Sequence, residues 1–121
     1  MRMLLGFTAL AEAGLGAVLL VYPPIVVRLL LGTEVSGAGI IVTRVAGIAL
    51  IGLGVACWPG SSAHQALYGM LAYNTLVMLY LIVVGLGGAA GILLWPAVAV
   101  HAALIVLLLR AAVKVRNRTA T

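Results

Sequence analysis

Charged side chains are scarce in this sequence of 121 residues. It holds seven Lys or Arg and only two acids, Glu12 and Glu34, so that charged residues make up 7% of the chain and hydrophobic residues 65%. A soluble domain carries about 25% charged residues and is about half apolar. A chain this short could not bury so much apolar surface in a water-soluble core. The composition therefore predicts an integral membrane protein.

The sequence also lacks the residues that most enzyme mechanisms need. Its single cysteine, Cys57, cannot form an internal disulfide, and one cysteine with two histidines is too few for a structural zinc site. There is no G-x-S-x-G, H-E-x-x-H or C-x-x-C motif, no phosphate-binding loop and no pair of neighbouring carboxylates. We therefore expect no catalytic activity, no metal and no cofactor, and we interpret Cys57 as a small apolar residue of a helix.

The sequence does contain four long apolar runs, at residues 3–22, 39–58, 63–86 and 92–113. Runs of about 20 apolar residues match the ~30 Å hydrocarbon core of a bilayer at a rise of ~1.5 Å per residue. The connections between the runs are short and leave no room for a soluble domain. The predicted fold is therefore all-α, a single domain over residues 1–121 with four transmembrane helices in an antiparallel bundle.

Prolines and glycines mark the predicted helix ends. Tyr22-Pro23-Pro24 ends the first helix, since proline cannot continue its hydrogen-bond ladder. Pro24 then suits the start of a short helix that we expect to end at Gly32 and to lie in the membrane interface. Ser62 and Gln65 predict a capping box that opens the third transmembrane helix. Because the connection before it, around Pro59-Gly60, is tight, we expect the second and third transmembrane helices to pack antiparallel.

Basic residues at the two ends of the chain predict its orientation. Arg2 lies near one end, and Arg110, Lys114, Arg116 and Arg118 lie near the other. The positive-inside rule places both termini in the cytoplasm, and the abundance of Ala, Gly and Val with Arg over Lys favours a bacterial plasma (inner) membrane. We expect Lys114, Arg116 and Arg118 to contact lipid headgroups, so the net charge of +5 does not indicate nucleic-acid binding.

Each apolar run carries one strongly polar residue near its middle, and these are Glu12, Arg44, Asn74 and His101. A lone charge at bilayer depth costs at least ~2.5–3.5 kcal/mol on insertion scales. Glu12 lies at the centre of its run and Arg44 ~7 Å toward the outer side of the centre of its own, at ~1.5 Å per residue. An Arg side chain can span that gap, so we expect these opposite charges to pair, directly or through Asn74 and His101. Such a buried polar cluster either fixes the register of the helices or forms a proton, ion or ligand site.

Two tyrosines form a candidate ligand stripe. Tyr73 and Tyr80 are seven residues apart and share one face of the third predicted transmembrane helix. A flat quinone or a lipid tail could lie along that face. Ordinary helix packing or lipid contact is the alternative interpretation.

Parts of the chain resemble two families of small membrane proteins. Pro23, residues 29–32 (Leu-Leu-Leu-Gly), Arg44-x-x-Gly47 and Gly52 resemble the layout of DoxX-like four-helix membrane proteins over roughly the first half of the chain. This resemblance implies an inner-membrane protein, sometimes associated with quinone-linked redox systems, and carries over no catalytic residue. Residues 9–12 (Ala-Leu-Ala-Glu) resemble the surroundings of the first-helix acid in small multidrug resistance transporters, where that acid couples protons to cationic drugs.

Small residues recur at helix-packing spacing. The rows are Ala9, Ala13 and Ala17; Gly39, Thr43 and Gly47; and Ala99 with Ala103. They favour a non-catalytic accessory subunit that packs in the lipid bilayer against itself, as a homo-oligomer, or against a larger membrane complex. A small proton- or ion-coupled transporter or channel using Glu12 and His101 is the alternative. A quinone- or haem-binding accessory subunit of a redox complex is a further alternative.

Overall fold

The computed structural model describes residues 1–60 and 62–121. Within them it contains five α-helices: α1 (Arg2–Val21), α2 (Pro23–Leu31), α3 (Ala38–Ala56), α4 (Ala63–Leu86) and α5 (Leu94–Thr119). All except α2 are long and apolar enough to cross a bilayer, which gives four candidate spans. The predicted all-α, polytopic fold is therefore confirmed. The largest difference in helix bounds is at α5, which continues beyond the predicted run and takes the basic residues into the helix.

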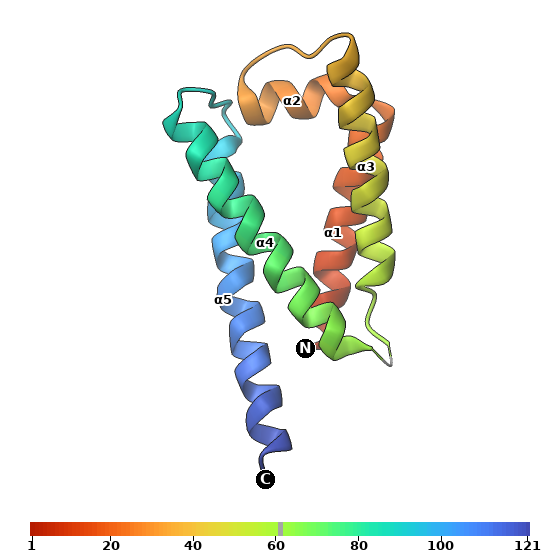
Figure 1. The fold of residues 1–121 in the computed structure, drawn as a ribbon, viewed down its shortest axis with the longest axis vertical. Coiled ribbons are helices and arrows are strands. Elements are labelled where there is room, and N and C mark those ends of the chain that lie inside the picture. Colours follow the sequence, from red (N-terminus) through yellow and green to blue (C-terminus); the bar gives the residue numbers. More distant parts are fainter. Residues whose placement is uncertain (61) are drawn as a thin grey trace.

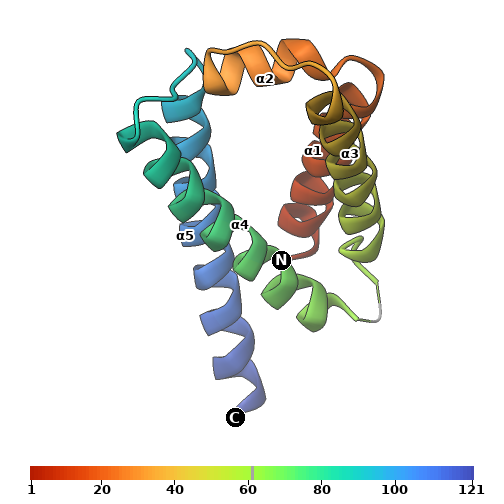
Figure 2. The ribbon, with the colours of Figure 1, turned by 45° about the horizontal axis from the view of Figure 1, so that its top comes forward.

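The four long helices form two pairs rather than an evenly packed bundle. Helix α1 packs against α3, and α4 packs against α5. Figures 1 and 2 show that the pairs approach each other where the start of α4 passes α1, and that α2 bridges them at the opposite end. The prediction that α3 and α4 pack together is wrong, because a tight turn fixes only that two helix ends are close and leaves their directions free.

Glycines set the close approach of α1 and α3. A Cβ atom added to Gly47 would lie 2.6 Å from the carbonyl oxygen of Gly16, and one added to Gly54 would lie 2.6 Å from that of Ala9. Residues without a large side chain let two backbones come this near, and such packing drives helix association where the hydrophobic effect cannot. Of the predicted small-residue rows, Ala9, Ala13 and Gly47 take part in this interface.

Helix α2 lies across one end of the molecule and is tied to the second pair (Figure 2). It ends at Gly32, as predicted, where the backbone turns left-handed with φ of 67°. Two of its last carbonyls accept bonds from the connection between α4 and α5. Gly91 N–H donates to the Leu30 carbonyl and Leu93 N–H to the Leu29 carbonyl, each at 2.8 Å. These bonds satisfy acceptors that a helix end leaves free.

Helix α4 begins at the predicted place but without the predicted cap. Ser62 is its N-cap residue, yet the serine side chain makes no capping hydrogen bond, so the capping box with Gln65 is wrong. The backbone explains the difference, because Ser62 has φ of −98° and ψ of 29°. A capping side chain works from an extended backbone at this position.

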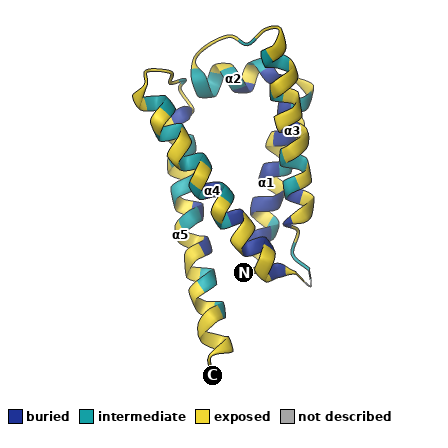
Figure 3. Cartoon of the chain, in the orientation of Figure 1, coloured by how far each residue is buried: buried dark blue, intermediate teal, exposed yellow. Residues whose placement is uncertain are grey.

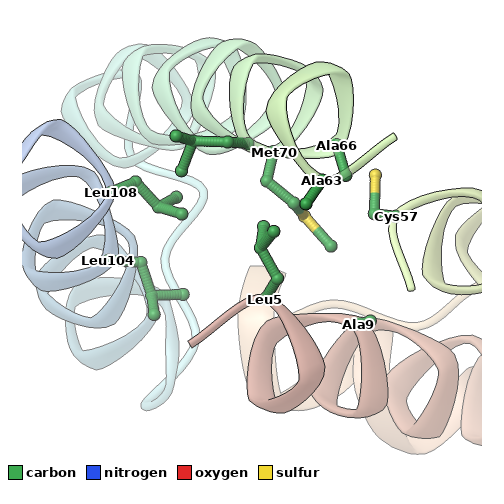
Figure 4. Close-up of a cluster of buried hydrophobic side chains, with 9 residues drawn as sticks. Leu5, Ala9, Cys57, Ala63, Ala66, Met70, Leu104 and Leu108 are labelled. Atoms are coloured by element: carbon green, nitrogen blue, oxygen red, sulfur yellow. The ribbon is translucent and has the colours of Figure 1, made fainter. Parts of the chain in front are cut away.

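The buried core is small and lies where the two pairs meet. Figure 4 shows its apolar side chains, which are Leu5, Ala9, Cys57, Ala63, Ala66, Leu67, Met70, Leu104 and Leu108. Elsewhere, Figure 3 shows exposed residues along the outer faces of the long helices, and many of these, such as Phe7, Ile41 and Leu76, are large and apolar. This surface suits hydrocarbon, since lipid tails are as apolar as leucine.

Candidate functional site

Three of the four predicted polar residues lie on the inner faces of α1, α4 and α5. Glu12 is 5% exposed and Asn74 is fully buried, and His101 is half-buried. Tyr73, which precedes Asn74 on α4, joins them into one chain of contacts. We call Glu12, Tyr73, Asn74 and His101 the polar relay.

The first contact of the polar relay crosses from α4 to α1. The Tyr73 hydroxyl donates to Glu12 Oε2 at 3.1 Å. Among the described residues this is the hydrogen bond that the carboxylate makes, and its Oε1 atom has no partner. No buried side-chain N or O atom in that part of the chain lacks a partner, so Oε1 keeps some accessible surface.

The second contact fixes the imidazole of His101. Asn74 Nδ2 donates to the Met70 carbonyl at 2.8 Å, and because a carbonyl only accepts, the amide must present Oδ1 on its other side. His101 Nδ1 lies 2.7 Å from that Oδ1 atom. Since Oδ1 also only accepts, a neutral His101 carries its proton on Nδ1 and leaves Nε2 as a bare acceptor.

The two contacts are connected by a ring pair. Tyr73 and His101 lie edge to face, with ring centroids 6.3 Å apart and planes inclined by 70°. This arrangement is one that aromatic pairs favour, because the positive edge of one ring meets the negative face of the other. The ring whose hydroxyl binds Glu12 and the imidazole that Asn74 holds are therefore in contact.

Both rings form part of the wall of a cavity of about 610 Å³ between the two helix pairs. Helices α1, α2, α4 and α5 supply nearly all of the wall, and α3 contributes Leu50. Every other lining residue is apolar, so Tyr73 and His101 are its polar groups. Sites for small molecules are typically of this size, mostly apolar, with a few polar groups that fix the orientation of the ligand.

Arg44 does not join Glu12. It lies exposed on α3, and the salt bridge found in the described residues joins Arg28 to Glu34, both exposed, near α2. The prediction that Glu12 and Arg44 pair is therefore wrong, and so is the inclusion of Arg44 in a buried cluster.

The register of α1 and α3 explains this result. Gly47 lies opposite Gly16, and since the helices are antiparallel (Figure 1), Arg44 is level with the last turn of α1. That level is roughly 10–13 Å along the axis from Glu12, at ~1.5 Å per residue. Arg44 is also close to the start of α3, where a long side chain can reach the lipid headgroups.

The prediction that Tyr73 and Tyr80 form a ligand stripe is correct for one of the two residues. Tyr73 lines the cavity, whereas Tyr80 is 70% exposed and is not among the lining residues. The reason is the inclination of α4 relative to the other long helices, which Figure 1 shows. The wall follows the row Tyr73, Val77 and Leu81, in which each member comes four residues after the one before, and Tyr80 lies outside that row.

The basic residues extend beyond the helix pairs. Lys114, Arg116 and Arg118 are exposed on the last turns of α5. Arg110, Lys114 and Arg118 follow each other at helical spacing along a shallow groove of about 600 Å³. In Figure 1 both chain termini lie at the end opposite α2, as an even number of spans requires.

Sequence reasoning missed the role of Tyr73 as the partner of Glu12. The available signal was its position next to Asn74, since adjacent helical residues differ by about 100° and so face two different neighbours. In the described part of the chain no group of three His, Cys, Asp or Glu residues could hold a metal ion.

Comparison with known proteins adds no relatives. No family model matches the chain, and no curated protein or solved structure shows significant similarity to it. The resemblances to DoxX-like proteins and to small multidrug resistance transporters therefore stay predictions.

Proposed function

We propose that this protein is a non-catalytic integral membrane protein that binds an elongated, lipid-soluble molecule with a polar head in the cavity between its helix pairs. The class includes membrane lipids and quinone-like molecules. One observation carries the proposal. The cavity of about 610 Å³ has an apolar wall in which Tyr73 and His101 are the polar residues, and both are held by partners behind the wall, Glu12 and Asn74.

The cost of burying polar groups supports this assignment. Tyr73 and His101 are placed in a largely apolar space, where polar groups without partners are expensive. A polar network of this kind is stabilising only when its members are satisfied. The head group of a bound molecule would supply the missing partner for the imidazole, while its apolar tail would cover the leucine and valine side chains of the wall.

Filling the cavity tests the proposal. Val77 lines the cavity, whereas Leu76, the residue before it, is 67% exposed and faces outward. In lipid nanodiscs, Val77→Phe should weaken binding of a spin-labelled or fluorescent quinol or lipid by about tenfold or more. Leu76→Phe, the matched control, should bind like the unmodified protein. If Val77→Phe binds unchanged, or if extraction and titration find no bound lipid-soluble molecule at all, the proposal fails.

We also propose that the protein resides in a bacterial inner membrane with both termini cytoplasmic. The exposed basic residues of α5 and Arg2 lie at the end opposite α2 (Figure 1). At the α2 end Arg28 and Glu34 cancel each other, which leaves Arg44 as the one net positive charge there, against five basic residues at the opposite end. The positive-inside rule favours this orientation. Reporter fusions test it, since a C-terminal fluorescent protein should be active in cells and a C-terminal alkaline phosphatase should not.

An accessory packing subunit is the second candidate function. Gly14 and Gly52 have open space around them, since no described residue outside their own helix backbone has an atom within 4 Å of an added Cβ. They leave two close-approach positions free for helices of another chain. Native mass spectrometry in the protein's own lipids would reveal a homo-oligomer or a partner chain. A monomer that still binds a lipid-soluble molecule would leave ligand binding as the supported function.

A further inference from the structure

The polar groups of the cavity wall offer hydrogen-bond acceptors and no donors. The proton of neutral His101 lies on Nδ1 and is donated to Asn74 Oδ1, 2.7 Å away. That tautomer follows from the amide, whose Nδ2 is already committed to the Met70 carbonyl. The remaining ring nitrogen, Nε2, carries a lone pair and no proton. It has no protein partner in the described residues and is not sealed from the surroundings.

Tyr73, like His101, offers the cavity an acceptor and no donor. A phenol has one proton, and Tyr73 donates it to Glu12 Oε2 at 3.1 Å. Its oxygen keeps lone pairs on the side away from that bond. The Tyr73 and His101 rings meet edge to face with centroids 6.3 Å apart, and both residues line the cavity, so both acceptors belong to the same wall.

We infer that the cavity selects molecules whose head group is a hydrogen-bond donor, that is, lipid-soluble alcohols, phenols and quinols, over molecules of the same shape with a carbonyl or ether head. This inference rests on the proposed function and specifies the ligand class. A hydroxyl head satisfies Nε2 directly. A carbonyl or ether oxygen would face the lone pair of Nε2, and both polar groups would stay unsatisfied inside the cavity.

A matched ligand pair tests the inference on the unmodified protein. A 4-alkylphenol and its methyl ether differ by one methyl group and by the loss of the donor. In nanodiscs at equal mole fraction, the phenol should bind at least about tenfold more tightly, which corresponds to one unsatisfied buried polar group. Equal binding of both compounds would overturn the donor rule and leave the proposed function standing. Binding of neither, with no other lipid-soluble ligand found, would overturn the proposed function itself.

The hydrogen bond to Asn74 that fixes the tautomer of His101 can be removed by substitution. Asn74→Leu keeps a side chain of similar volume but frees Nδ1, so that His101 can present Nε2–H to the cavity. The preference for the phenol should then fall toward equal binding. Thr75→Val is the control, because Thr75 bonds the Leu71 carbonyl of its own helix and does not line the cavity. A preference that survives in Asn74→Leu would contradict the role given to Asn74.

A spectroscopic measurement covers the case in which Asn74→Leu does not fold. In a His64→Gln background with ¹⁵N-labelled histidine, His101 is the one histidine of the chain. Its two ring nitrogens have different shifts according to which carries the proton. We expect the proton on Nδ1 in the folded, ligand-free protein. A proton on Nε2 would overturn the inference, whatever the variants show.

Discussion

The hydroxyl of Tyr73 on α4 reaches the carboxylate of Glu12 on α1 over 3.1 Å, at the border between the buried core of the two helix pairs and the cavity. The bond therefore joins the pairs as well as orienting the ring that lines the cavity. The buried polar residues can therefore both fix the helix register and form a ligand site. The bond from Tyr73 to Glu12 holds α4 to α1 and also orients the tyrosine in the cavity wall.

Removing this hydroxyl should measurably destabilise the protein. Tyr73→Phe leaves Glu12 without its hydrogen-bond donor, and an unsatisfied buried polar group costs about 1–3 kcal/mol. We expect the free energy of unfolding, measured by circular dichroism in mixed micelles with increasing denaturing detergent, to fall by that amount. Tyr80→Phe removes the same atom from an exposed position of the same helix. If both variants unfold alike, the bond to Glu12 contributes nothing.

The α1–α3 interface depends on glycine at defined positions. A Cβ at Gly47 would lie 2.6 Å from the Gly16 carbonyl oxygen, whereas Gly52 on the same helix has no atom within 4 Å of its added Cβ. Gly47→Val should lower the free energy of unfolding by about 1–3 kcal/mol through overpacking. Gly52→Val carries the same change in side chain and should have little effect. Equal losses in the two variants would show that helix propensity, and not the close approach, determines the result.

Glu12 and Arg44 should behave as independent residues. They lie on different levels of the α1–α3 pair, and Arg44 is exposed. In a double-mutant cycle of Glu12→Gln and Arg44→Leu, the effects on unfolding free energy should add within about 0.3–0.5 kcal/mol, as they do for distant sites. A coupling energy well above this range would show that Glu12 and Arg44 interact, and would contradict their separation in the structure.

The features that could be predicted from the sequence are local ones. The end of the first helix at Pro23 and the end of α2 at Gly32 follow from what proline and glycine do to a backbone. Their signals lie within a few residues, so no knowledge of the neighbouring helices is needed. The four apolar spans are predictable for a similar reason, because span length is set by the bilayer.

The helix neighbours could not be predicted, because they depend on rotation and register. The charges of Glu12 and Arg44 suggested one register for α1 and α3, but the approach of Gly47 to Gly16 sets another. Backbone contact over several turns outweighs an ion pair that Arg44 can replace by reaching the headgroups. Likewise the cavity follows the row from Tyr73 to Leu81, because α4 is tilted, and no pattern in its sequence encodes that tilt.

The basic groove of α5 should bind anionic lipid. Arg110, Lys114 and Arg118 lie along one groove, and a basic residue near an anionic surface contributes about 1 kcal/mol. Replacing all three by glutamine should reduce the number of phosphatidylglycerol molecules retained in native mass spectrometry, with no change for phosphatidylcholine. Added salt should have the same effect on the unmodified protein, because exposed charges are screened.

Arg28→Gln is the control, since Arg28 already pairs with Glu34 near α2. Retention that is equal in the triple variant and in Arg28→Gln would mean that the groove does not recognise the lipid charge.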